Sequence, residues 1–229
     1  MSTRRVSGGY GKNRVLFDVD FVAKNEITAV IGANGSGKST LLRSMCSLCD
    51  VYSGQILLHD HNITNTPTHK ITNLGISYMQ QTNNVFSELS VYENLVIANM
   101  PDDPNPECIS DVFPDLALLQ RRKARQLSGG QRQLLAMAMA LAKKPKVMLF
   151  DEPTANLSPK NAGIVLQKVK EMQHRLGNCV IIVEQNVQAA LDLCDKCYLL
   201  SGGKVTYHGD PQKLLADPAL LQKYLGVKE

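Results

Sequence analysis

The feature that most constrains the fold is a glycine-rich turn that joins an apolar segment to a helical pattern. Residues 27–31 are apolar or β-branched, which predicts a short buried strand. The next eight residues, GANGSGKS, fit the pattern G-x-x-x-x-G-K-[ST]. Residues 38–48 then show helical periodicity, so the turn lies between a strand and a helix. This order of elements predicts a loop that binds phosphate groups.

The residue types of this loop match the chemistry of phosphate binding. Glycines let backbone N–H groups converge on phosphate oxygens, and the following helix points its positive N-terminus at the same anions. Lys38 is expected to place a charge near the β- and γ-phosphates, and Ser39 to offer its hydroxyl to Mg²⁺. An ordinary glycine-rich turn, the alternative, does not explain the lysine and its strand–helix context together. The predicted nucleotide-binding residues are Gly32, Asn34, Gly35, Ser36, Gly37, Lys38, Ser39 and Thr40.

A second apolar segment, residues 146–150, ends in two carboxylates. In nucleotide hydrolases with such a loop, an aspartate at this place holds the Mg²⁺ shell, and Asp151 is predicted to do so. Glu152 is the candidate to orient or deprotonate an attacking water. Two solvated acids at a strand end are an equally good interpretation of this segment alone, but not of the segment after a phosphate loop.

The rest of the chain alternates apolar strand segments with helical patterns, which predicts a mostly parallel sheet covered on both faces. Strands are expected at residues 55–58, 75–79, 179–183 and 198–200, with 204–208 as the partner of the last. Helices are expected at residues 90–100, 111–121, 129–143, 159–176, 187–193 and 211–225, and a loop at 101–106. Because residues 82–143 look mainly helical, an inserted helical subdomain is predicted there.

Composition excludes several classes of protein. The net charge of +4 and the pI near 8.7 are too mild to indicate a nucleic-acid partner. No apolar run approaches the roughly 20 residues of a transmembrane helix, and the first ten residues have no signal-peptide core. A cytoplasmic chain that meets the membrane through a partner is expected.

Two of the cysteine pairs have C-x-x-C spacing, Cys46 with Cys49 and Cys194 with Cys197. Such pairs can bind zinc or exchange electrons. The favoured interpretation is packing, because Cys46 belongs to an apolar helical pattern and Cys197 leads into an apolar strand.

A third motif, Leu127-Ser128-Gly129-Gly130-Gln131, precedes the pattern of a long helix. Ser128 is expected to cap that helix and leave its first N–H groups free for an anion. The motif resembles the signature of the ABC ATPases, and the phosphate loop and Asp151-Glu152 flank it in the order of that family. The resemblance covers nearly the whole chain. It implies ATP as the nucleotide, bound by Ser128, Gly129, Gly130 and Gln131 across a dimer, on the phosphate loop of the other subunit.

The same resemblance assigns roles to two further residues. Tyr10 matches the aromatic residue that stacks on adenine in the family. Gln81 matches the glutamine that contacts Mg²⁺ and the attacking water, although Gln80 directly before it could take that place. The helical stretch after Gln81 looks like the part that docks on a membrane permease.

Two positions depart from the family pattern. Ser158 stands where an aspartate is usual, and Gln185 stands where the switch histidine is usual. Both departures, together with the run Val-Glu-Gln-Asn at 183–186 and the end Tyr-Leu-Gly-Val at 224–227, look like the paired ATPases of branched-chain amino-acid importers and of urea importers. Another importer or exporter, a soluble ABC ATPase without a transport role, and a scaffold that binds ATP with little turnover remain alternatives.

The predicted fold is therefore an α/β ABC nucleotide-binding domain over residues 1–229, with a small antiparallel β region and a helical subdomain at about 82–143. The resemblance implies permease subunits, an identical or paralogous ATPase subunit and, indirectly, a substrate-binding protein as partners, at the cytoplasmic face of the membrane. The predicted catalytic residues are Glu152, Gln81 and Gln185, and the predicted metal ligands are Ser39, Gln81 and Asp151.

Overall fold

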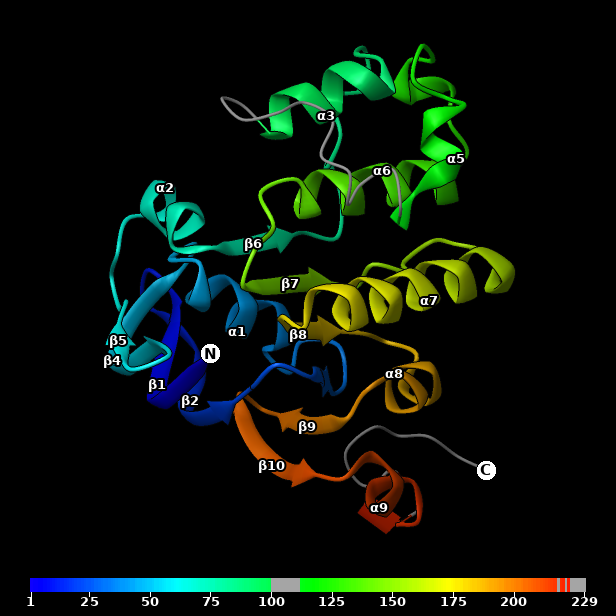
Figure 1. The fold of residues 1–229 in the computed structure, drawn as a ribbon. Coiled ribbons are helices and arrows are strands. Elements are labelled where there is room, and N and C mark those ends of the chain that lie inside the picture. Colours follow the sequence, from blue (N-terminus) through cyan, green and yellow to red (C-terminus); the bar gives the residue numbers. More distant parts are fainter. Residues whose placement is uncertain (100–111, 218, 221, 223–229) are drawn as a thin grey trace.

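The computed structural model describes residues 1–99, 112–217, 219, 220 and 222. Its larger sheet has six strands in the order β10-β9-β3-β8-β7-β6, and only β10 runs antiparallel to its neighbour (Figure 1). The strands are β3 (Ile27–Ile31), β6 (Ile76–Met79), β7 (Val147–Asp151), β8 (Cys179–Val183), β9 (Lys196–Ser201) and β10 (Lys204–Gly209).

The central strands of this sheet are apolar because both of their faces are covered. Every residue of β3, β7 and β8 is buried, as expected for a parallel sheet between two layers. The register pairs Met79 with Phe150 and Asp151 with Val183. The carboxyl ends of β6, β7, β8 and β3 therefore reach the same edge, which is where ligands bind in open α/β sheets.

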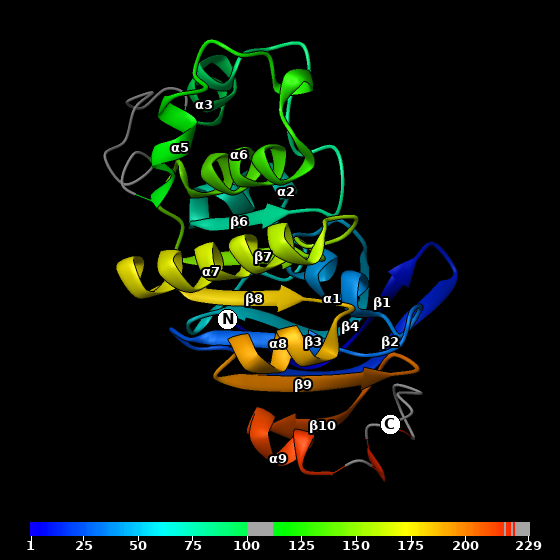
Figure 2. The same cartoon turned by 90° about the vertical axis from the view of Figure 1, so that its right-hand side faces the viewer.

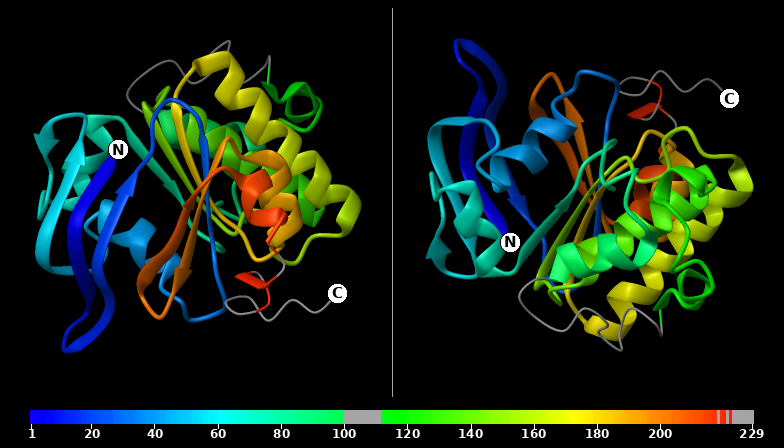
Figure 3. Two further views of the ribbon diagram at one scale, coloured as in Figure 1. Left: turned by 90° about the horizontal axis from the view of Figure 1, so that it is seen from below. Right: turned by 90° about the horizontal axis from the view of Figure 1, so that it is seen from above.

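A smaller antiparallel sheet forms the second layer, in the order β2-β1-β4-β5. Helix α1 (Lys38–Met45) lies between the two sheets, as Figure 3 shows, and buries Leu41, Leu42 and Met45 completely. The strands of this sheet are β1 (Ser2–Tyr10), β2 (Asn13–Val22), β4 (Asp50–Leu58) and β5 (His61–Asn62). The helix that follows the phosphate loop is thus fixed by packing on both sides.

Helices cover the other face of the six-stranded sheet and extend beyond its β6 edge. Helices α7 (Pro159–Leu176) and α8 (Val187–Leu193) lie on the sheet, and α6 (Gly129–Leu141) with α3 (Val91–Asn99) and α5 (Pro114–Ala117) lies beyond β6 (Figures 1 and 2). The remaining helical segments are α2 (Thr68–Ile71), α9 (Pro211–Leu215) and 3₁₀ turns at Thr72–Leu74 and Ala124–Gln126. The grouping of α3, α5 and α6 agrees with a helical region at 82–143, and its treatment as a subdomain stays a prediction.

Several sequence predictions are confirmed residue by residue, namely the strands at 27–31 and 179–183 and the helices at 159–176 and 187–193. Ser90 caps α3 as expected, since its Oγ accepts from the Glu93 N–H at 3.2 Å. The first helix ends at Met45, because Ser47 adopts a positive φ of 54°. The helix predicted to reach residue 143 ends at Leu141.

The helix predicted at 111–121 is confirmed only in part, since α5 makes a single turn and residues 118–121 form turns. The helical region is interrupted at Phe113, with a φ of −125° and a ψ of 60°, because a residue before proline is disfavoured in the helical conformation. Beyond α5, the carbonyl oxygens of Gln120 and Arg122 accept from the N–H groups of Tyr92 and Val91 at 3.1 and 2.9 Å, which joins this segment to α3. The helix predicted at 211–225 is confirmed for α9 and for residues 219, 220 and 222, with a break after α9. Residues 218, 221 and 223–229 and the loop at 101–106 lie outside the described residues.

Candidate nucleotide-binding site

The phosphate loop connects the end of β3 to the start of α1, and its glycines are required by the surrounding fold. A Cβ on Gly32 would lie 2.2 Å from the carbonyl oxygen of Leu200. Gly37, which precedes α1, has a φ of 102°, a left-handed conformation that other residues adopt only with strain. The local sequence therefore specifies a loop that approaches neighbouring backbone closely.

Lys38 and Ser36 are the polar side chains buried within this loop. The Lys38 ammonium donates to the carbonyl oxygens of Gly32 and Ala33 at 2.8 and 3.1 Å. Burial lowers the pKa of Lys38, and the negative charges of Glu152 and Asp151 oppose that shift. The Ser36 hydroxyl is buried and finds no hydrogen-bond partner in the part of the chain that the structure describes. An unpaired hydroxyl beside a buried cation is an arrangement that fits a bound phosphate.

Asp151 is held at the end of β7 by two hydroxyl groups. Ser39 Oγ donates to Asp151 Oδ1 at 2.7 Å, and the Tyr78 hydroxyl donates to Oδ2 at 2.9 Å. Ser39 and Asp151 together present oxygen atoms, the ligand type that Mg²⁺ prefers, so the residues fit the predicted metal. Tyr78 is not predicted from the sequence, because only the pairing of its strand with β7 brings its hydroxyl to the site.

Glu152 follows β7 in a left-handed conformation, with a φ of 51°, and is buried. Its carboxylate oxygen Oε2 accepts from Gln81 Nε2 at 2.7 Å and from Gln185 Nε2 at 2.6 Å. The three predicted catalytic residues therefore meet, although they follow three different strands. Both amides bind the same oxygen, which fixes the orientation of the carboxylate.

The two neighbouring glutamines differ in their contacts. The backbone N–H of Gln80 binds Asn84 Oδ1 at 3.1 Å, and its carbonyl accepts from Asn84 Nδ2 at 2.6 Å. Gln80 thus belongs to a surface turn, and Gln81 is the residue that reaches Glu152.

A pocket of about 400 Å³ collects most of these groups. All residues that line this pocket are predicted from the sequence except Val15 of β2. Three predicted residues, Gly32, Ser36 and Asp151, do not line the pocket. The lining residues are Val15, Asn34, Gly35, Gly37, Lys38, Ser39, Thr40, Gln81, Glu152 and Gln185.

Tyr10 stands apart from this pocket. It ends β1, is 40% exposed, and its hydroxyl accepts from Arg43 Nη1 at 3.1 Å. Tyr10 does not line the pocket, so its stacking on adenine stays a prediction.

The signature motif is built as predicted but lies outside the pocket. Ser128 caps α6: its Oγ accepts from the Gln131 N–H at 3.2 Å, and its own N–H donates to Gln131 Oε1 at 3.0 Å. Ser128 and Gly129 are exposed, and neither they nor Gly130 and Gln131 line the pocket. The structure brings the loop, the acidic pair and both glutamines together, but not the signature.

A family model described as "ABC transporter" matches residues 16–155. The chain belongs to this family. It is 45% identical to the probable branched-chain amino acid transport ATP-binding protein LivF of Archaeoglobus fulgidus, over 99% of both chains. It is 36% identical to the high-affinity branched-chain amino acid transport ATP-binding protein BraG of Pseudomonas aeruginosa, again over 99% of both. A solved ATP-binding cassette of an ABC transporter in its ADP conformation superposes with a TM-score of 0.87, at 27% identity and 96% coverage of each chain.

As a member of this family, the chain is an ATP-hydrolysing subunit of an ABC transporter. No helix in its described part is long and apolar enough to cross a membrane.

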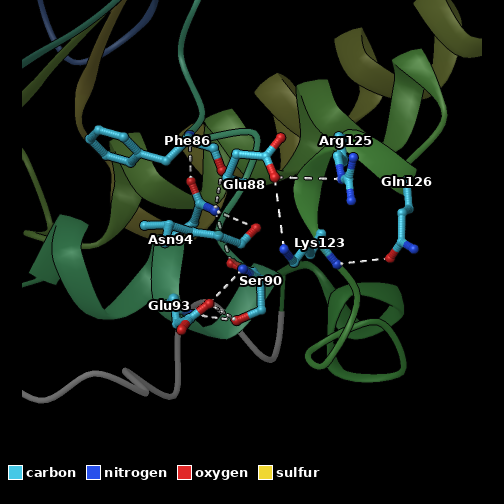
Figure 4. Close-up of polar contacts among 9 residues, drawn as sticks. Phe86, Glu88, Ser90, Glu93, Asn94, Lys123, Arg125 and Gln126 are labelled. Atoms are coloured by element: carbon cyan, nitrogen blue, oxygen red, sulfur yellow. Dashed lines mark hydrogen bonds and ion pairs between the residues drawn. The ribbon is translucent and has the colours of Figure 1, made fainter.

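In this ABC ATPase, the chain before the signature is bound to the chain after Gln81 (Figure 4). The N–H groups of Ala124 and Arg125 donate to the carbonyls of Leu89 and Ser87 at 2.8 and 2.9 Å. On the surface, Glu88 Oε2 lies 3.7 Å from Lys123 Nζ and 3.6 Å from Arg125 Nε. The two segments form one hydrogen-bonded unit that ends three residues before Ser128.

Asn94 of α3 holds one half of this unit and was missed from the sequence. It is fully buried; its Oδ1 accepts from the Phe86 N–H at 2.8 Å, and its Nδ2 donates to the carbonyls of Phe86 and Ser90 at 3.1 and 2.8 Å (Figure 4). A buried amide with its donors and acceptor used specifies the path of the segment it binds. The signal in the sequence is an asparagine that directly precedes the apolar run Leu-Val-Ile-Ala at 95–98 of the helix.

The two departures from the family pattern have distinct structural settings. Ser158 caps α7, with its Oγ accepting from the Asn161 N–H at 3.4 Å and Pro159 in the first helical position. A serine in this place therefore serves the helix start. Gln185, by contrast, reaches the pocket and binds Glu152.

The cysteines that the structure describes are mostly buried. Burial raises the pKa of the Cys46 and Cys197 thiols to about 12. Among residues 1–99, 112–217, 219, 220 and 222, no group of three or more histidine, cysteine or acidic side chains is arranged to hold a metal ion.

Proposed function

We propose that this ABC ATPase energises the uptake of branched-chain amino acids. The observation that carries the proposal is the 45% identity to the LivF relative over 99% of both chains. The lipopolysaccharide export ATPase LptB of Escherichia coli is also related, but at 32% identity. Gln185, which stands where the family has a histidine, binds Glu152 and is therefore part of the site.

The proposed roles of the residues follow from their contacts. Lys38 and the loop amides bind the β- and γ-phosphates, and Ser39, Asp151 and Gln81 would hold Mg²⁺, which offsets phosphate charge. Glu152 orients the attacking water and accepts its proton. Gln81 and Gln185 hold Glu152, and each amide has a second N–H that can meet the γ-phosphate or the water. Catalysis by such a site rests on positioning and on stabilising charge.

The site proposed here is completed by a second ATPase subunit, identical or paralogous. None of Ser128, Gly129 and Gly130 lines the pocket of its own chain, and Ser128 and Gly129 are exposed. This placement supports a role on the nucleotide of the other subunit. The helical region after Gln81 docks on permease subunits at the cytoplasmic face, and a substrate-binding protein delivers the cargo. The whole chain acts as one ATPase domain with residues 82–143 as its subdomain, and no nucleic acid takes part.

The test is ATP-dependent uptake by vesicles that contain the candidate permease, both ATPase subunits and the substrate-binding protein. Leucine uptake should require ATP and should fall by roughly 10²-fold or more with Glu152→Gln, because a general base contributes about that much. The same variant should hold two chains together in the presence of ATP, as light scattering can show. Uptake of urea in place of leucine, or no ATP-dependent pairing, would contradict the proposal.

A further inference from the structure

Glu184 is a buried carboxylate that the roles above leave unused. It directly precedes Gln185 and is 2% exposed. Its Oε1 accepts from the Thr154 N–H at 3.1 Å and from Thr154 Oγ1 at 2.8 Å, and its Oε2 lies 2.9 Å from the same hydroxyl. Burial raises the pKa of Glu184, and the hydrogen bonds from Thr154 oppose that rise. Burying a carboxylate is costly, so the contact with Thr154 is a strong constraint on both segments.

The bond extends the pairing of two strands beyond their ends. Within the sheet, Asp151 of β7 pairs with Val183 of β8. One residue further, the Glu152 N–H donates to the Val183 carbonyl at 2.9 Å. If the strand pairing continued, the Thr154 N–H would donate to a backbone carbonyl. It donates to the Glu184 side chain instead. Glu184 thus forms the last link between the turn that carries Glu152 and the segment that carries Gln185.

Packing alone does not hold this turn. A cavity of about 410 Å³ lies against it, lined by Thr154, Ala155 and Leu157 as well as by Glu184. Glu152 and Gln185 line both this cavity and the nucleotide pocket, so they separate the two spaces. A turn beside an open space can shift, and its hydrogen bonds then decide its position.

We propose that Glu184 is a positioning residue for ATP hydrolysis. Through Thr154 it fixes the turn after Glu152 against the end of β8, and it thereby sets the contact between Glu152 and Gln185. The inference rests on the catalytic roles proposed for those two residues. It assigns Glu184 an effect on turnover and little effect on the affinity for ATP, because Glu184 does not line the nucleotide pocket.

The experiment compares steady-state hydrolysis by the assembled transporter with variants of this chain. Glu184→Ala should lower kcat by about 10- to 100-fold, since small misplacements of catalytic groups have effects of that size, and leave KM for ATP within about threefold. Glu184→Gln should recover most of the loss, because its carbonyl oxygen still accepts from the Thr154 N–H. Thr154→Val, which keeps the backbone bond and removes the hydroxyl, should give an intermediate kcat.

Val180→Ala is the matched control, because Val180 is a fully buried residue of β8, the strand that Glu184 follows. It should lower the melting temperature while leaving kcat unchanged. If Glu184→Ala folds and keeps kcat within about twofold of the parent, or raises KM alone, the inference is wrong. If Glu184→Ala does not fold, Thr154→Val with parental kcat overturns it equally. Glu152→Gln is measured in parallel to tell failure of this inference from failure of the proposed function. If Glu152→Gln keeps the parental turnover, the proposed role of Glu152 is refuted. If Glu152→Gln loses turnover and Glu184→Ala keeps it, only the role of Glu184 is refuted.

Discussion

Gly32 and Gly37 of the phosphate loop differ from Gly129 of the signature in how closely other atoms of the chain approach them. A Cβ on Gly32 would lie 2.2 Å from the Leu200 carbonyl, and one on Gly37 would lie 3.0 Å from Leu16 Cδ2. A Cβ on Gly129 would meet only Leu157 Cδ2, at 3.5 Å, which is an ordinary contact. The fold of this chain therefore requires glycine at 32 and 37, but its described part gives no steric reason for glycine at 129.

The difference separates a site that is largely complete within one chain from a surface that we propose to act on the nucleotide of a partner. The loop, Asp151 and Glu152 bind one another through residues of their own chain. In the signature, Ser128 and Gln131 satisfy each other, while the N–H groups at the start of α6 have no partner within the helix itself. A missing Cβ over such N–H groups suits the close approach of an anion from outside the chain.

Gly129→Asp gives the largest expected effect. An aspartate in the first turn of α6 is favourable for the helix by about 0.3–1 kcal/mol. The same charge would repel a γ-phosphate, and loss of such an anion site costs about 10²–10³ in turnover. We expect an unchanged or raised melting temperature, unchanged ATP affinity of the isolated chain, and hydrolysis by the assembled complex reduced at least about 100-fold.

Gln212→Asp is the control for this substitution, since it puts the same charge into the first turn of α9. It should leave hydrolysis at the parental rate. Parental hydrolysis by Gly129→Asp would remove the distinction between the two regions, because the signature would then contribute nothing to a nucleotide.

Lys38→Ala tests the self-contained region, which is the site that the phosphate loop, Asp151, Glu152 and the two glutamines form within one chain. Removing this charge should cost about 1.5–3 kcal/mol of phosphate contact, so the affinity of the isolated chain for MgATP should fall at least tenfold. Calorimetry on the single chain measures this without a partner. Lys143→Ala removes an exposed lysine that does not line the pocket, and its affinity should equal that of the parent. Equal affinities for both variants would disprove the assignment of the phosphate loop.

The two regions also differ in how far the sequence predicts them. The loop, α1 and the acidic strand are local patterns whose chemistry is readable from spacing, and the structure confirms their secondary structure. The meeting of Gln81, Glu152 and Gln185 depends on the order of the strands, so only resemblance to a family could anticipate it. Around the signature, the path of the chain depends on Asn94 and on backbone bonds between segments about 30 residues apart. Such bonds leave no periodic pattern in the sequence, so the connection between these segments could not be predicted from it.

Asn94→Ala probes that non-local support. The Phe86 N–H loses its acceptor, and a buried group left unsatisfied costs about 1–3 kcal/mol. The carbonyls of Phe86, Leu89 and Ser90 each lose one of two donors. We expect a loss of about 2 kcal/mol in the free energy of unfolding, with parental ATP affinity of the isolated chain. Asn84→Ala, which removes a half-buried asparagine bound to the backbone of Gln80, should cost less than about 1 kcal/mol. If Asn94→Ala weakens nucleotide binding as much as it lowers stability, the two regions are not independent.

Gln185→His is expected to have the smallest effect, and it addresses the one residue of the self-contained region that departs from the family. Gln185 now donates a neutral amide N–H to Glu152 at 2.6 Å. A histidine of similar reach can donate the same bond and also carry a positive charge near neutral pH, whereas an amide does not titrate. We expect hydrolysis by the assembled complex to rise by up to about tenfold, equivalent to about 1.4 kcal/mol of transition-state stabilisation.

The dependence on pH distinguishes this electrostatic effect from a change of shape. A neighbouring carboxylate such as Glu152 favours the charged form of the imidazole, so the gain should be greatest at pH 6 and should shrink as the pH rises toward 8. Gln185→Asn, which keeps the amide on a shorter side chain, should lose the contact with Glu152 and lower the rate at every pH. A loss of rate in the histidine variant at all pH values would mean that the pocket is shaped for the amide.

A gain of rate would support the view that this chain, which lacks the histidine charge, is the slower half of an asymmetric pair. Glu152→Gln should then cost the complex less than the same change in a partner chain that has the histidine. Equal losses from the two chains would remove the asymmetry, and full activity of this chain alone would remove the need for a paralogous partner.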